Sequence, residues 1–236
     1  GNDFVWFIEQ VIGEPAYVSG HSSGGLLAAW LAANFPQNVR GVVLEDPPFF
    51  STEPDRREKT FAWLDGFEII HRFLNQSAET NYTRFYLKNS YLRNLIGKPW
   101  DDMTNYAFRY LEKNPGKPLR IFFLPASVNR NFELLAGPYD LRFGNTFYDG
   151  HWFINFDQAE TLSRIRVPSI LIHTNWRYSE DGVLLAAMDE ADAQRAHELI
   201  AGNGLITVRS RHDFHYEKPQ EFIQVMLDFL QTHPSE

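Results

Sequence analysis

Several absences restrict what this chain of 236 residues can do. It contains no cysteine, which excludes a disulfide framework, a thiolate metal site and a cysteine nucleophile, and which fits a reducing compartment. No apolar run approaches the ~18 residues of a membrane-spanning helix, and residues 1–10 lack the pattern of a secretory signal peptide. We therefore expect a cytoplasmic protein.

Positive charge is also scarce. The chain has 22 Lys and Arg residues against 30 Asp and Glu residues, a net charge of −8. A polyanionic phosphate backbone would be repelled, so we expect no nucleic-acid partner. What remains is a composition with 44% hydrophobic and 15% aromatic residues, which is typical of a globular protein.

The first part of the chain alternates helix and strand patterns. Residues 3–12 place apolar groups on one helix face, and residues 16–19 form a short apolar strand pattern. An apolar helical stretch over 25–35 follows, and then a second strand pattern over 39–44. Alternation of this kind predicts an α/β fold with a mostly parallel sheet wrapped by helices.

The same alternation returns after a long interruption. Strand and helix patterns follow one another in this order: 169–174, 190–200, 205–209 and 220–231. The intervening stretch is too long for a connection between strands, is rich in aromatic residues and contains helix-like segments. We interpret it as a mainly helical insertion. The predicted organisation is a core in two parts, 1–50 and 164–236, that flank an insertion over 51–163.

The sequence Gly20-His21-Ser22-Ser23-Gly24 carries the functional signal. A serine hydroxyl becomes a nucleophile when it is exposed, oriented and paired with a base. A sharp turn from strand to helix exposes it, and glycines two residues before and two after relieve the crowding. This motif lies between a strand pattern and a helix pattern, as that geometry requires.

The chain here resembles the α/β-hydrolase family. Four segments carry the resemblance, in the family's order: YVSGHSSGGLLAAWLA, VRGVVLEDPPF, VPSILIH and RHDFHYEKPQEFIQVMLDFL. The resemblance implies the family's fold, with the insertion in the position of its helical lid. It also implies Ser22 as nucleophile and a backbone N–H of Ser23 as one oxyanion donor.

The resemblance further implies a histidine base in the last loop. His212 follows Arg211, which stands where the family usually has glycine, and Glu217-Lys218-Pro219 comes after it. His215 is better interpreted as a packing or supporting residue. His71, His151, His173 and His197 lack this loop context, and surface or satisfied core positions are the default for them.

The acid of the triad has three candidates. The family places it after one of two strands, and Asp46 follows the earlier strand directly. Asp46 is preferred because chemistry in such sheets lies at the carboxyl ends of the strands. Asp181 is the second candidate and Glu180 the third, both in the loop after the later strand.

A second oxyanion donor belongs, in this family, to a loop upstream of the nucleophile. Only 19 residues precede Gly20, so we expect a separate N-terminal segment or chain to complete the fold. Two His-containing fragments, Asp149-Gly-His151 and Asp213-Phe-His215, offer two ligands each, and we expect neither a metal nor a cofactor.

The resulting hypothesis is a carboxylesterase-like serine hydrolase. It would cleave an ester or related acyl bond of a small to medium apolar substrate through an acyl-enzyme. Two alternatives stay open, because one scaffold hosts many reactions. The first is a small-ligand receptor with slow or no turnover, and the second is a C–C bond hydrolase.

Overall fold

The computed structural model describes residues 1–233, and the chain divides into two compact units. The core unit combines Gly1–Thr60 with the chain from Asn155 onward, and the helical unit is Phe61–Ile154. Within the described residues, no helix combines the length and the apolar character needed to cross a bilayer.

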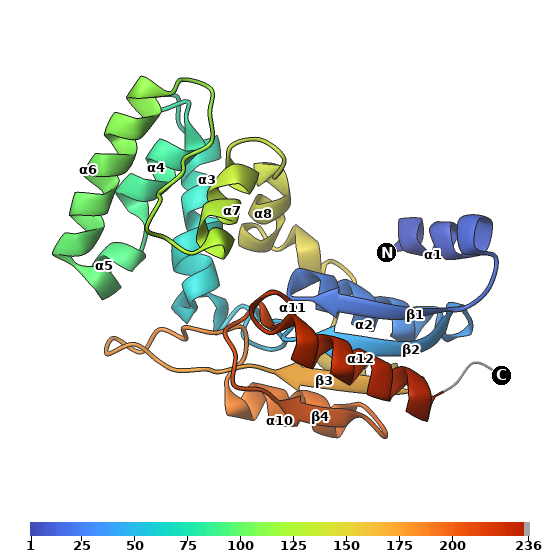
Figure 1. The fold of residues 1–236 in the computed structure, drawn as a ribbon. Coiled ribbons are helices and arrows are strands. Elements are labelled where there is room, and N and C mark those ends of the chain that lie inside the picture. The colour runs from blue at the N-terminus through green and yellow to red at the C-terminus, as the bar shows by residue number, and fades with distance from the viewer. Residues whose placement is uncertain (234–236) are drawn as a thin grey trace. The chain divides into compact units, whose positions relative to one another are not determined.

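A parallel sheet of four strands forms the centre of the core unit (Figure 1). Its strands lie in chain order, β1 (Ala16–His21), β2 (Val39–Glu45), β3 (Ser169–His173) and β4 (Gly204–Thr207). All three neighbouring pairs are parallel. β2 and β3 are almost wholly buried, as expected of strands covered on both faces. The predicted parallel sheet with flanking helices is confirmed.

Helices cover both faces of this sheet. Helix α2 (Ser23–Asn34) packs against β1 and β2, and α12 (Pro219–Thr232) covers the opposite face (Figure 1). The α12 face is sealed by a cluster in which Phe229 packs with Val43 and Ile172. The remaining elements of the core unit are short: α1 (Asn2–Phe7), the π-helical η1 (Ile8–Ile12), η2 (Pro36–Asn38), η3 (Arg57–Lys59), α9 (Gln158–Arg164), α10 (Glu190–Leu199) and α11 (Phe214–Glu217).

The elements of the helical unit are all helical. They are η4 (Trp63–Phe67), α3 (Glu68–Leu74), α4 (Tyr82–Asn89), α5 (Leu92–Ile96), α6 (Lys98–Lys113), α7 (Ala126–Leu135), α8 (Leu141–Tyr148) and η5 (His151–Phe153). The aromatic residues mostly pack on each other there; the rings of Phe67 and Phe147 stack 4.7 Å apart.

The helical unit is narrower than the insertion predicted over 51–163. Residues on both sides of it belong to the core unit instead. The buried side chain of Gln158 shows why, because its Oε1 accepts a hydrogen bond from the Phe50 amide at 2.7 Å and its Nε2 donates to Thr52 Oγ1. Helix α9 also packs on α2. These contacts tie both ends of the predicted insertion to the core.

The turn between β1 and α2 is the tightest part of the core unit. Ser22 has φ 54° and ψ −123°, a conformation that non-glycine residues rarely adopt. A Cβ on Gly20 would lie 2.2 Å from the carbonyl oxygen of Gly24, and one on Gly25 would lie 2.8 Å from Pro47 Cβ. A Cβ on Gly24 would meet open space. Close packing therefore requires Gly20 and Gly25, and the sequence-based assignment of this requirement to Gly24 is wrong.

We expect Gly20→Ala to lower the free energy of unfolding by about 1–3 kcal/mol, because the new methyl group collides with backbone. The matched variant Gly24→Ala should be neutral or raise stability by up to ~1 kcal/mol, because alanine favours the helix. Urea unfolding followed by circular dichroism measures both. Equal losses in the two variants would contradict this account of the turn.

Candidate active site

Ser22 lies at the carboxyl edge of the sheet, directly after β1. Its amide donates a hydrogen bond of 2.9 Å to the carbonyl oxygen of Glu45, which joins the turn to the end of β2. Helix α2 begins at the next residue, so the Ser23 amide is among the N–H groups without a partner inside the helix. The positive end of the helix dipole thus lies beside the Ser22 hydroxyl, where it favours developing negative charge.

Asp46 follows β2 at the same edge, and its carboxylate is almost wholly buried. Its Oδ2 accepts a hydrogen bond from His212 Nδ1 at 2.8 Å and another from the Thr174 hydroxyl at 2.7 Å. Its Oδ1 accepts the Thr174 amide at 3.2 Å. The structure therefore brings together two of the predicted site residues, 166 positions apart in the chain.

Each member of this pair shifts the pKa of the other. Burial alone would raise the pKa of Asp46, but its interactions with His173, His212 and Thr174 outweigh burial and hold the pKa well below its ordinary value. Burial likewise opposes the charged form of His212, yet the adjacent Asp46 raises the pKa of that imidazole. A stable carboxylate is thus positioned to hold the proton on Nδ1 and to compensate a positive imidazole.

His212 also lies beside the turn that carries Ser22. The ring centroids of His21 and His212 are 4.5 Å apart, and His21 Nε2 contacts the carbonyl oxygen of His212 at 3.1 Å. Burial, followed by the neighbouring His212, lowers the pKa of His21. Because His21 directly precedes Ser22, this contact fixes the His212 loop against the turn that carries the hydroxyl.

The other two acid candidates lie elsewhere in the loop after β3. Asp181 is exposed and accepts a hydrogen bond from the Ser179 hydroxyl at 2.6 Å, and Glu180 is also exposed. Neither shares the buried setting of Asp46.

Sequence reasoning missed two residues that contact Asp46. The strand pattern over 169–174 makes Thr174 the end of a strand, and nothing in the sequence distinguishes His173 from an ordinary core or surface histidine. His173 is 1% exposed, and its Nδ1 lies 3.7 Å from Asp46 Oδ1, within ion-pair range. The available signal was their position, since both stand at the carboxyl end of the strand next to β2.

His215 contacts a different carboxylate. Its amide donates to Glu45 Oε1, and its Nδ1 lies 2.9 and 3.0 Å from the two Glu45 oxygens. The supporting position expected for His215 agrees with this pair. Three other histidines have different surroundings: His71 stacks on Tyr148, His151 pairs with Asp149, and His197 is half-buried on α10.

Comparison with known proteins shows the family of the chain. A family model described as the alpha/beta hydrolase fold matches residues 1–119, half of the chain. The chain belongs to the alpha/beta hydrolase family. The esterase from Exiguobacterium antarcticum has a similar fold, with a TM-score of 0.58 and 18% identity, over 98% of this hydrolase-family chain and 72% of the esterase.

Two curated proteins are similar to this chain over different lengths. Proline iminopeptidase from Saccharolobus solfataricus is 25% identical over 233 residues, which are 94% of this chain and 64% of that protein. The chloroplastic pheophytinase of Arabidopsis thaliana is 45% identical over 51 residues, 21% of this chain and 10% of that protein. The chain therefore spans less than two thirds of the length of either curated relative.

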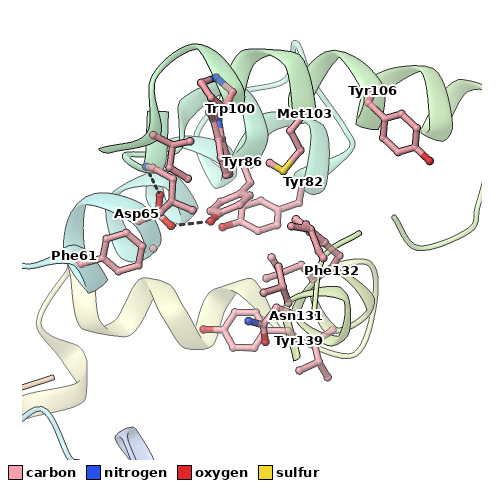
Figure 2. A pocket seen from close by; sticks show the side chains of 18 of the residues that line it. Phe61, Asp65, Tyr82, Tyr86, Trp100, Met103, Tyr106, Asn131, Phe132 and Tyr139 are labelled. Carbon is pink, nitrogen blue, oxygen red and sulfur yellow. Dashed lines mark hydrogen bonds between the residues drawn. The ribbon is translucent and has the colours of Figure 1, made fainter. Parts of the chain in front are cut away.

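The helical unit contains a cavity of its own, of about 1110 Å³ (Figure 2). Aromatic and aliphatic side chains line most of it, among them Tyr82, Trp100, Met103 and Phe132. Two carboxylates, Asp65 and Asp102, also border it, and Asp65 accepts hydrogen bonds from the Tyr86 hydroxyl at 2.7 Å and the Ser90 hydroxyl at 2.5 Å. Burial raises the pKa of Asp65 despite these bonds. Such a lining suits an apolar ligand.

We expect N-phenyl-1-naphthylamine, whose fluorescence rises in apolar surroundings, to bind this cavity. Met103→Lys should weaken its binding about tenfold, or ~1.4 kcal/mol, because an ammonium would intrude on the apolar lining. Asn105→Lys adds the same charge to an exposed position of α6 and should leave the affinity unchanged. Fluorescence titration measures both, and equal affinities in the two variants would contradict binding at the cavity.

Proposed function

We propose that this chain carries the catalytic groups of a serine hydrolase that cleaves ester or related acyl bonds. The observation that supports it best is the buried Asp46 carboxylate holding His212 Nδ1 at 2.8 Å, at the sheet edge where the strained Ser22 turn lies. Acid, base and nucleophile then follow the logic of a triad. The family membership and the esterase-like fold agree with this class of reaction.

In the proposed reaction, the Ser22 hydroxyl attacks the substrate carbonyl carbon while its proton passes to His212 Nε2. The carbonyl oxygen takes up the electron pair, and the Ser23 N–H stabilises the resulting oxyanion. Collapse of the tetrahedral intermediate expels the leaving group, which receives the proton from His212. Water repeats the sequence on the acyl-enzyme, releasing the acid and restoring the Ser22 hydroxyl.

Asp46 has two tasks in this scheme. Its hydrogen bond keeps the proton of neutral His212 on Nδ1, which leaves Nε2 free to accept the proton of Ser22. Its charge then compensates the imidazolium that forms. Thr174 donates from both its amide and its hydroxyl, and these bonds fix the carboxylate in the orientation that His212 requires.

We propose an apolar substrate of small to medium size. The apolar lining of the cavity in the helical unit supports this choice, because the walls offer few groups that could pair with a charged ligand. The named activities of the relatives, an esterase and a proline iminopeptidase, both involve acyl bonds.

A fluorophosphonate should add once to the protein, at Ser22, because only an activated serine hydroxyl displaces its fluoride. Ser22→Ala should abolish the adduct. Ser23→Ala retains the backbone N–H and should still be labelled. Intact-mass spectrometry reads the result, and an adduct that persists in Ser22→Ala would contradict the assignment of the nucleophile.

The identity of the acid is tested by the rate of the same labelling. Asp46→Asn should slow it by about 10⁴-fold, because the amide favours the wrong tautomer of His212. Asp181→Asn and Glu180→Gln should label at the wild-type rate. Circular dichroism verifies that Asp46→Asn is folded, and a loss of rate confined to Asp181→Asn would reassign the acid to the later strand.

A further inference from the structure

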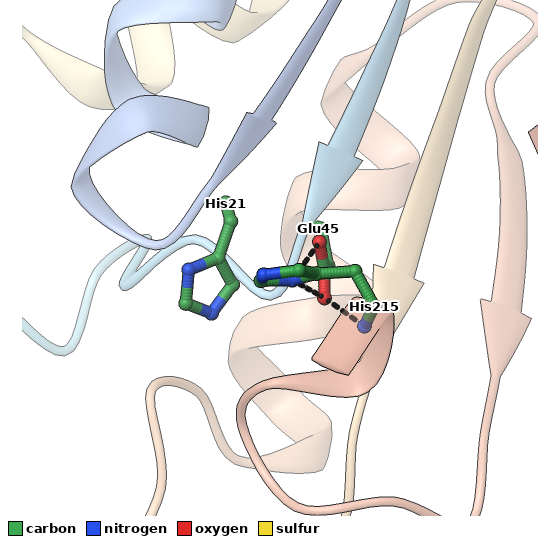
Figure 3. A group of neighbouring side chains, drawn as sticks. All are labelled: His21, Glu45 and His215. Atoms are coloured by element: carbon green, nitrogen blue, oxygen red, sulfur yellow. Dashed lines mark hydrogen bonds and ion pairs between the residues drawn. The ribbon is translucent and has the colours of Figure 1, made fainter. Parts of the chain in front are cut away.

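Three side chains beside the Asp46–His212 pair have no task in the reaction proposed above. They are His21, Glu45 and His215 (Figure 3). Each offers one nitrogen or oxygen ligand atom, and these atoms all lie within 4.8 Å of one another. The cluster contains two imidazoles and one carboxylate.

Strand register and a short helix build the cluster. His21 ends β1 and pairs in register with Glu45, which ends β2, so neighbouring strand ends present both side chains together. His215 comes from α11, and its amide bond to Glu45 Oε1 fixes that helix to the strand end. Three segments distant in the chain therefore converge on one carboxylate.

The three side chains differ in their exposure to solvent. The Glu45 side chain is 2% exposed, whereas His215 is 41% and His21 26% exposed. A buried carboxylate needs a cationic partner or a metal, because an unpaired charge is costly to bury. The exposed His215 leaves a route from solvent to that carboxylate.

We propose that His21, Glu45 and His215 form a binding site for a divalent transition-metal ion of the zinc type. Two imidazoles and one carboxylate are the protein ligands of several catalytic zinc sites, which keep a fourth position for water. Imidazole donors select zinc-type ions over magnesium and calcium, which prefer oxygen ligands.

The change needed to bind the ion is small. Tetrahedral zinc with bonds of about 2.0–2.1 Å holds its ligand atoms roughly 3.4 Å apart. His215 Nδ1 already lies 2.9–3.0 Å from the Glu45 oxygens, and rotation of the partly exposed imidazoles closes the remaining distance. The ion takes the place of the proton between His215 Nδ1 and Glu45, and neutral His215 then carries its single proton on Nε2.

Hydrogen-bond acceptors also lie near the ring of His21, where they could orient it as a ligand. Ligand histidines usually direct their second nitrogen to a carbonyl or carboxylate oxygen. His21 Nε2 contacts the His212 carbonyl at 3.1 Å and lies 3.6 Å from Asp213 Oδ1. The ion would therefore join the nucleophile turn, the end of β2 and the last loop.

The test is a titration of the metal-free chain with zinc chloride, in competition with a chromogenic chelator. We expect one zinc ion per chain and a higher Tm with zinc present, because the ion binds the folded state. His215→Gln retains a donor for Glu45 but loses the imidazole, and it should weaken zinc binding by at least about tenfold. Magnesium and calcium should not compete.

Three further variants separate this site from other zinc binding. His151→Gln removes an exposed histidine paired with Asp149, and it should bind zinc as the wild type does. His212→Gln should also retain the site, because His212 is not one of the proposed ligands. Glu45→Gln should lose it, with circular dichroism as the check on folding.

A result of no zinc bound to the wild-type chain would overturn the proposal and leave Glu45–His215 as a structural pair. Unchanged affinity in His215→Gln would also overturn it. Loss of binding in His212→Gln alone would assign the ion to the triad histidine instead. Every readout is independent of labelling at Ser22, so the metal site and the hydrolase proposal can fail separately.

Discussion

A single buried negative charge governs the organisation of the site. The Asp46 carboxylate is 1% exposed, and an isolated charge in that setting would be strongly unfavourable. Its contacts come from two segments: His173 ends β3 and Thr174 follows it, while His212 comes from the loop after β4. Loss of one of these contacts would leave the buried carboxylate with fewer partners and destabilise it. The carboxylate therefore holds the ends of β2 and β3 and the loop after β4 together.

Two adjacent carboxylates contact different histidines of the segment that follows β4. Glu45 binds His215, while Asp46 binds His212, although the two acids are neighbours in the chain. The backbone makes this possible, because Asp46 has φ 44° and so departs from the direction of β2. A strained residue at the end of the strand thus sends successive side chains to different partners.

The local parts of this arrangement could be predicted from the sequence. The Gly20 to Gly24 motif lies between two periodic segments, and the parallel sheet follows from the alternation of strand and helix patterns. The resemblance to the family predicted His212 in the loop after the last strand. These features depend on residues close together in the chain, so their patterns can be recognised in the sequence.

The parts that depend on strand neighbours could not be settled in this way. Three acids remained open because the choice rests on which loop packs against His212. Thr174 and His173 carry no motif, and they matter only because β3 lies next to β2. The Glu45–His21 pairing is likewise a matter of register. Crowding at Gly25 arises from Pro47, which is distant in sequence and could not be read from the turn motif.

The division of the chain has a consequence for how such a protein can diversify. Ser22, Asp46 and His212 all lie in the core unit, whereas the apolar cavity is lined entirely by residues 61–139, inside the helical unit. Substitutions in the cavity walls can therefore accumulate without touching the buried charge that organises the loops of the core unit. The cavity lining and the Asp46–His212 pair are encoded on separate stretches of the gene, and each can change, or be exchanged, without the other.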